Sequence, residues 1–349
     1  MRTPPPWLWF LLAAGALGLA LFWWRRVGAR RSRRLRELVR RCQAAEAAQG
    51  GPGPAWEARL RAAVEPLPAA QRRRYAQPWM LCVGDPAADL AQLLATAQPA
   101  GPLSVADSDA FWRWWSLDGM VAIEIRPPPL GPSSAPQDAA WLHALQVLAR
   151  ERPRLPLHGI VLCVAAATLR ADPAVLAGLL ELMARRLCET AGLLGLRLPV
   201  HVVVTGLQRL EGFDAVREAL PDAALARALG HRLPPEAGAL PQEEVLLDAL
   251  FDAVFDTVEE QLHALRVGLL PEASDAGARQ GIHLFVQEFA TLRPGLRALV
   301  EQLSRFGTEG QVFWRSLYFC AVAPQAAFVH DPLMRFLPAD QPLARERGG

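Results

Sequence analysis

The chain has 349 residues and a formal net charge of +2. This length suits one large domain, or two modest ones, beside a membrane segment. The sequence contains no lysine and no asparagine, so all 37 basic residues are arginine. A phosphate-binding loop that depends on lysine is therefore excluded in its usual form, as is a guanine-reading N-K-x-D motif.

An uncharged apolar run from Trp7 to Trp24 opens the chain, and it is long enough to cross a hydrocarbon core of roughly 30 Å. The stretch from Arg25 to Arg41 that follows is rich in arginine and contains one acid, Glu37. The positive-inside rule places this flank in the cytoplasm and the Met1–Pro6 tail outside. A cleaved signal peptide is the alternative, but its charges would precede the apolar run. We therefore expect residues 1–24 to form a single transmembrane anchor, with the bulk of the chain cytoplasmic.

Residues 25–74 are predicted to form a basic juxtamembrane helix and a linker. Apolar side chains at Leu35, Leu38, Val39 and Cys42 follow the i, i+3, i+4, i+7 spacing of an amphipathic helix. Anionic lipid headgroups are the nearest partners for its arginines, so we expect lipid contact and no nucleic-acid binding.

Cysteine and histidine usage predicts no metal site. The cysteines are odd in number and widely spaced, no C-x-x-C pair occurs, and the histidines stand singly. The cysteines are Cys42, Cys82, Cys163, Cys188 and Cys320. We interpret them as reduced structural thiols.

Residues 75–215 alternate continuous apolar runs with helical patterns, which indicates an α/β fold with a mostly parallel sheet and helices on both faces. The predicted strands are Trp79–Val83, Met120–Ile125, Ile160–Ala165 and Val200–Thr205. The predicted helices lie near Ala87–Ala97, Ala139–Arg152 and Ala174–Leu194.

Residues 216–349 are predicted to form a helical extension. A long helix begins after Pro241, and a second helical pattern is kinked or restarted at Pro294. A late strand is expected near 317–322. The helical block Val216–Gly310 is either a docking surface or a lid packed over the sheet.

The turn after the first predicted strand has the strand–turn–helix context of a phosphate-binding loop. Compared with G-x-x-x-x-G-K-[ST], the loop starts at Gly84 and carries Ala88 at the second glycine. Asp89 stands at the lysine and Leu90 at the Ser/Thr that would reach Mg²⁺. Asp85 adds a second acid, so the charge of the loop repels the phosphate that its shape suggests.

Several segments, taken in order and spacing, resemble one family. They are Pro78–Gly84, Trp114–Glu124, Trp141–Val161, Leu198–Phe213, Leu284–Pro294 and Arg315–Phe319. Together they resemble the cytoplasmic GTPase-like part of the IcmF/TssM family, the inner-membrane component of type VI secretion systems. The resemblance implies a P-loop GTPase-like fold and a place in the bacterial inner membrane.

The chain departs from the family at each nucleotide motif. Where the family has D-T-A-G, this chain has Glu124 through Pro127, and a proline has no N–H for a γ-phosphate. Where the family has T-K-x-D, the chain has Thr205, Gly206 and Gln208 around Leu207, without the base-reading carboxylate. Since phosphoryl transfer depends on positioning and charge stabilisation, we expect a pseudo-GTPase with no catalytic residue and no cofactor.

Family members carry further spans and a large periplasmic region, so we interpret this chain as a truncated form. The expected function is that of a membrane-anchored, non-catalytic scaffold or accessory component of a type VI secretion complex. By resemblance, its partners would be a TssL/DotU-like protein, a full-length TssM or baseplate components. One alternative is an atypical nucleotide-binding regulator, a GTPase-like switch that uses Arg126 or Arg209 in place of lysine. Another is a membrane protein unrelated to secretion that borrowed the fold.

Overall fold

The computed structural model describes residues 77–97, 112–125, 135–235, 244–306 and 312–347, together with residues 15, 33, 35–38 and 40. The predicted span Trp7–Trp24, apart from Gly15, and most of the predicted juxtamembrane helix and linker at 25–74 therefore lie outside the described residues. Within the described part of the chain, no helix has the length and apolar character required to cross a bilayer.

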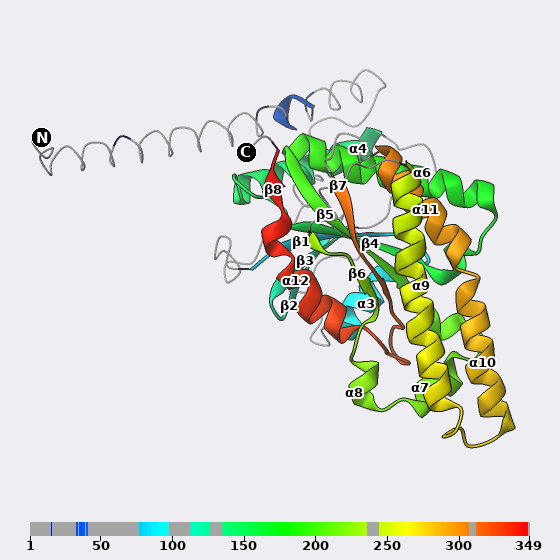
Figure 1. The fold of residues 1–349 in the computed structure, drawn as a ribbon. Helices are drawn as coiled ribbons and strands as arrows, with labels where there is room; N and C mark the ends of the chain where they lie inside the picture. The colour runs from blue at the N-terminus through cyan, green and yellow to red at the C-terminus, as the bar shows by residue number, and fades with distance from the viewer. Residues whose placement is uncertain are drawn as a thin grey trace, which may run out of the picture.

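The centre of the molecule is a mixed sheet whose strands follow the order β2-β3-β1-β4-β5-β7-β6, with β8 paired to β5 outside this path (Figure 1). The strands are β1 (Trp79–Gly84), β2 (Trp112–Leu117), β3 (Met120–Ile125), β4 (Gly159–Ala165), β5 (Leu196–Thr205), β6 (Leu229–Arg232), β7 (Val312–Phe319) and β8 (Arg345–Glu346). The run β3-β1-β4-β5-β7 is parallel, whereas β2, β6 and β8 are antiparallel to their neighbours. The predicted mostly parallel sheet is confirmed.

Helices cover both faces of this sheet, as predicted. They are α3 (Leu90–Ala97), α4 (Ala135–Glu151), α5 (Ala166–Leu169), α6 (Pro173–Leu194), α7 (Phe213–Ala219), α8 (Asp222–Leu225), α9 (Glu244–Leu269), α10 (Ala276–Ala290), α11 (Arg293–Phe306) and α12 (Leu337–Ala339). Helix α3 and the C-terminal segment (residues 329–340) pack on one face, while α4, α6 and the α9–α11 group build the larger core on the other. The red C-terminal segment and cyan α3 in Figure 1 belong to the first face.

Helix α6 shows how local sequence sets an element. Asp172 caps its first turn by accepting the Ala174 N–H at 2.9 Å, and Pro173 fits the first helical position. Gly195 ends the helix in the left-handed region at φ 61°, which a glycine adopts without steric cost. The helix can therefore start and stop sharply between β4 and β5.

The α9–α11 group is packed onto the sheet. Phe255 and Phe289 have ring centroids 6.0 Å apart, and Phe289 lies 4.5 Å from the ring of Phe319 on β7. Helix α10 ends at Ala290 and α11 begins at Arg293, so the predicted restart near Pro294 is confirmed. Whether this helical group serves as a docking surface or as a lid over the sheet stays a prediction.

Several element boundaries differ from the prediction: β5 begins at Leu196 and α4 at Ala135, each four residues before the predicted start, and two further differences have a visible cause. The helix expected from Ala87 begins only at Leu90, because Asp89 adopts a positive φ of 48° and the Asp85 carboxylate holds the Ala87 N–H. The late strand expected at 317–322 is β7 at 312–319. Its polar residues, which broke the apolar pattern, are buried and paired inside the protein.

The division of the chain at residue 215 stays a prediction. The structure shows that β6 and β7, which come after this point, complete the sheet begun by β1 to β5. Strand β7 pairs with β5 from Leu198 to Val204 and also carries β6 on its other side. Strands β2 and β6 were not predicted. The signal for β2 was the Asp118-Gly119 hairpin turn, in which Gly119 has φ +84°.

Candidate functional site

The predicted loop lies at the carboxyl end of β1, where ligands bind in open α/β sheets. Strand β1 lies between β3 and β4, both parallel to it, so the strand order reverses here. Gly84 is the last residue of β1, and a Cβ atom there would lie 3.2 Å from both the Cβ and the carbonyl oxygen of Cys163. The glycine is thus explained by close packing of β1 against β4.

The rest of the loop is compact. Ala88 is fully buried, Asp89 is exposed in the left-handed region, and Leu90 begins α3 with its side chain in the core. Ala88 lies four residues after Gly84, so the loop is one residue shorter than G-x-x-x-x-G-K-[ST]. The loop has therefore lost length as well as lysine.

Asp85 is the central residue of the site. Its buried carboxylate accepts the N–H of Ala87 at 2.7 Å, the N–H of Ala165 at 2.6 Å and the hydroxyl of Thr168 at 3.1 Å. Hydrogen bonds to an ionised acceptor are short and strong. The sequence predicted that Asp85 would repel a phosphate. In the structure, its carboxylate is itself the anion bound by the loop and by the β4–α5 turn.

The predicted base-reading segment is also used internally. The Thr205 hydroxyl donates to the carbonyl oxygen of Ala88 at 2.7 Å and so ties the end of β5 to the loop. Gly206 takes a positive φ of 85°, and the Gln208 Oε1 atom accepts the N–H of Val322 at 3.3 Å. The structure thus brings Thr205 to the loop and directs Gln208 to the segment after β7.

The predicted switch segment is only partly described. Glu124 is buried on β3, where its Oε2 atom accepts the indole N–H of Trp115 on β2 at 2.8 Å. Arg113 lies 3.9 Å from its other oxygen. Burial, and then the charge of Glu124, raise the pKa of Cys82 well above its usual range. Pro127 and Arg126 lie outside the described residues.

A small cavity lies beside the loop. This cavity of about 40 Å³ lies between the loop, Ile125, Trp141 and α6, close to the ~30 Å³ that one water occupies in the liquid. Pockets that hold small ligands measure about 300–1,000 Å³. Arg209 is exposed at the end of the short helix η2 (Leu207–Arg209), and within the described part of the chain its side chain forms no hydrogen bond or ion pair with the loop.

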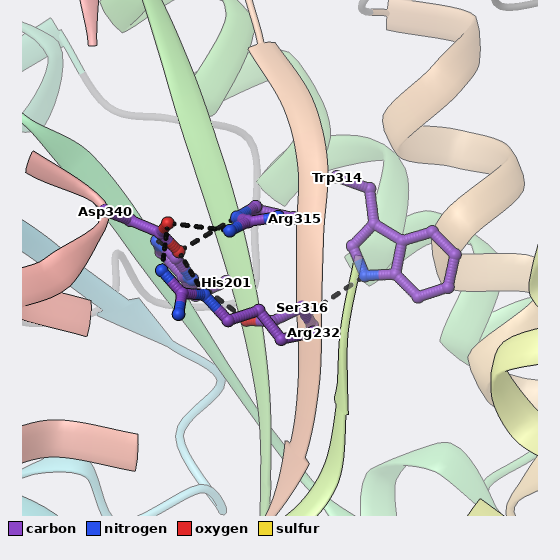
Figure 2. A network of polar contacts seen from close by, with 6 residues as sticks. All are labelled: His201, Arg232, Trp314, Arg315, Ser316 and Asp340. Carbon is purple, nitrogen blue, oxygen red and sulfur yellow. Dashed lines mark hydrogen bonds and ion pairs between the residues drawn. The ribbon is translucent and has the colours of Figure 1, made fainter. Parts of the chain in front are cut away.

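A second polar site lies under the C-terminal segment (Figure 2). Asp340 is 1% exposed and accepts paired hydrogen bonds from two arginine forks. Arg315 of β7 donates from Nε and Nη2 at 2.9 Å each, and Arg232 of β6 donates from the same two atoms at 3.1 and 2.5 Å. These arginines lower the pKa of Asp340 against the opposing effect of its burial. Asp340 thus anchors the C-terminal segment to two strands.

His201 of β5 completes this network. Its Nδ1 atom lies 2.9 Å from the Ser316 hydroxyl, and its Nε2 atom lies 4.0 Å from Asp340. Burial lowers the pKa of His201 to about 4, so the ring is neutral at physiological pH. The pairing of β5 with β7 shifts between Val200 and His201, which leaves Arg315 as an extra residue. Such an irregularity re-aims a side chain, and here it directs Arg315 to the face where Asp340 lies.

This network was not predicted from the sequence. Its signal was a set of polar residues inside apolar strands: His201 in β5, and Arg315 with Ser316 in β7. A buried charge requires a partner of opposite charge, so Arg315 within an apolar strand indicated that such a partner exists. Among the described residues, no group of three or more histidine, cysteine or acidic side chains could hold a metal ion.

Comparison with known proteins defines the class. A model of the IcmF-related N-terminal domain matches residues 135–347, which is more than half of the chain. The chain therefore belongs to the IcmF/TssM family, as its motifs predicted. It is also 25% identical over 262 residues to the type VI secretion system component TssM1 of Pseudomonas aeruginosa. That match covers 71% of this chain but 24% of TssM1, so the chain spans about a quarter of this relative. No solved structure matches.

Proposed function

We propose that this protein is a membrane-anchored, non-catalytic scaffold or accessory component of a type VI secretion complex. Family membership and the similarity to TssM1 support the secretion context. The apolar run Trp7–Trp24, with arginines after it, supports a single inner-membrane anchor with a periplasmic N-terminus. A TssL/DotU-like protein, a full-length TssM and baseplate components are the partners proposed by resemblance.

The proposal that the protein is not a catalyst rests on the hydrogen bonds of the Asp85 carboxylate. This carboxylate takes up N–H and hydroxyl donors of the loop and of the β4–α5 turn. The strand order β2-β3-β1-β4-β5-β7, with β2 antiparallel, is compatible with a degenerate GTPase-like domain. In this proposal the domain is kept for the surfaces that it presents.

Nucleotide titration tests the non-catalytic part. The melting midpoint of the full chain, in non-ionic detergent, is measured with GTP, GDP and ATP in the presence of Mg²⁺. A ligand that binds only the folded state raises the midpoint, so we expect no rise. A rise of several degrees at sub-millimolar nucleotide would instead favour the switch-like regulator.

Co-purification tests the secretion part. The chain, tagged at its C-terminus, is cross-linked in native membranes, and the captured proteins are identified by mass spectrometry. We expect TssL-like, TssM-like or baseplate proteins to be enriched over an unrelated single-span protein with the same tag. Their absence, in a genome without sheath and baseplate genes near this gene, would favour a membrane protein outside secretion.

A further inference from the structure

An open groove of about 670 Å³ lies between α8, the edge strand β6 and the short π-helix η4 (Pro332–Phe336). Its floor includes Tyr318 and Phe336, whose rings are stacked with centroids 6.0 Å apart and planes at 24°. Alanines of the α8–β6 segment line one wall. In Figure 1, α8 and β6 lie next to the red C-terminal segment that supplies the other wall.

The two walls are joined by the backbone, so the groove is a built feature of the fold. The N–H of Phe328 donates to the carbonyl oxygen of Leu225 at 2.6 Å, and the N–H of Asp331 donates to that of Ala226 at 3.1 Å. Asp340, bonded to Arg232, holds the segment after η4 against the same sheet face. The groove therefore keeps its width without a ligand.

The lining of the groove carries an excess of positive charge. Its arginines are Arg227, Arg232 and Arg335, its acid is Asp331, and two histidines, His231 and His330, also line it. Arg227 is exposed and has no ion-pair partner among the described residues. Arg335 pairs with Asp331 at 3.1 Å, but 66% of its side chain is exposed. Arg232 is occupied by Asp340, so Arg227 and Arg335 are the arginines that can meet a ligand.

The distribution of these charges favours a peptide over a free phosphate. The two available arginines come from separate segments, the α8–β6 connection and η4, and border a floor of aromatic rings and alanines. A small anion would be held by donors that converge on one point, whereas an acidic peptide needs positive charges along its path and apolar surface between them. We propose that this groove binds an acidic peptide segment of a protein partner, with its apolar side chains against Phe336 and the alanines of the opposite wall. The proposal is independent of whether the loop at Gly84 binds nucleotide.

Fluorescence anisotropy on the full chain tests this proposal. The probe is a fluorescein-labelled peptide in which single leucines are separated by pairs of glutamates, and the buffer contains non-ionic detergent. Arg227→Glu and Arg335→Glu are compared with Arg185→Glu on α6. Arg185 is a matched control, because it also forms an i,i+4 pair, with Glu181, and has a side chain 65% exposed. Circular dichroism verifies that each variant is folded. If a glutamate variant is not folded, Arg227→Gln, a milder substitution, is used to test the groove.

We expect each groove variant to weaken binding by about tenfold or more, and the control to leave the affinity unchanged. Binding should also weaken as salt is raised. Equal effects of all three variants, or no binding by the unsubstituted chain, would overturn the proposal. Displacement of the peptide by inorganic phosphate, beyond that by chloride at equal ionic strength, would show that the groove recognises phosphate and would overturn it as well.

Discussion

The Asp85 carboxylate at the end of β1 accepts the N–H of Ala165, the last residue of β4, at 2.6 Å. This bond joins the carboxyl ends of two neighbouring parallel strands at the position where such folds place a ligand. Thr205 adds a third strand end through its bond to Ala88. Two side chains of the protein, Asp85 and Thr205, thus connect the carboxyl ends of β1, β4 and β5 at the loop.

Replacing Asp85 by alanine should destabilise the fold, because the N–H of Ala165 would be left buried and without an acceptor. We expect a loss of about 1–3 kcal/mol in the free energy of unfolding, measured by urea denaturation. Asp89→Asn is the matched control, since Asp89 is exposed and asparagine tolerates its positive φ. A loss for the control as large as that for Asp85→Ala would contradict the assigned role.

Stability should fall as the pH drops from 6.5 towards 4, because two histidines are buried in the neutral form. Burial lowers the pKa of His158 and of His201 from 6.5 to about 4. The unfolded chain binds protons throughout this window and the folded chain does not, so protonation favours unfolding. His158 also accepts the N–H of Trp79 at Nδ1, over 3.1 Å, which requires a neutral ring.

His158→Asn tests this pH dependence, since the asparagine carbonyl can accept the same N–H but does not titrate. We expect a shallower decline of the urea midpoint between pH 6.5 and 4 than in the unsubstituted chain. An unchanged slope would show that His158 does not contribute. The pKa of Asp340 is lowered, so the stability it provides is lost at still lower pH, below its usual value of 3.8.

Asp340→Ala should be among the most damaging single substitutions. It leaves Arg315, which is buried, without its charge partner and removes one partner of Arg232. Breaking a buried ion pair costs about 3–5 kcal/mol. Glu181→Ala, which breaks an exposed pair with Arg185, should cost about 1 kcal/mol or less. Similar urea midpoints for the two variants would refute the importance of the network.

Two helical glycines should respond in opposite directions to alanine. A Cβ atom at Gly295 of α11 would lie 2.2 Å from the carbonyl oxygen of Leu169, so Gly295→Ala forces α11 away from α5. We expect a loss of about 1–3 kcal/mol. Gly178 of α6 has open space around it, and Gly178→Ala should raise stability by roughly 0.5–1 kcal/mol. Calorimetry of both variants measures the difference, and a stabilising Gly295→Ala would exclude this contact.

The apolar runs predicted the central strands because strands buried on both faces contain little else. Met120–Ile125 has the predicted bounds, and β4 begins only one residue before its predicted start. Strand β7 was misplaced, since Arg315 and Ser316 interrupt its pattern and their partners lie far away in the sequence. The sequence shows these polar residues within an apolar run, but which residues pair with them depends on the fold.

The loop could be located from the sequence, but its contacts could not. The residues from Gly84 to Leu90 showed that lysine and the second glycine were missing. That Asp85 binds Ala165 and Thr168, which follow it by about 80 residues, depends on the parallel pairing of β1 with β4. The negative charge of Asp85 predicted repulsion of a phosphate. In the structure, the same carboxylate accepts hydrogen bonds from the protein's own N–H and hydroxyl groups.

The position of β7 sets the order in which the domain can be completed. Until residues 312–319 are available, β5 exposes an unpaired edge and β6 has no neighbour in the sheet. An unpaired apolar edge strand is a template for association with other chains. During synthesis, more than a hundred residues separate the end of β5 from the start of β7, so the nascent chain must shield β5 for that interval. At the synthesis rate of roughly 5–20 residues per second, this takes roughly 5–20 seconds.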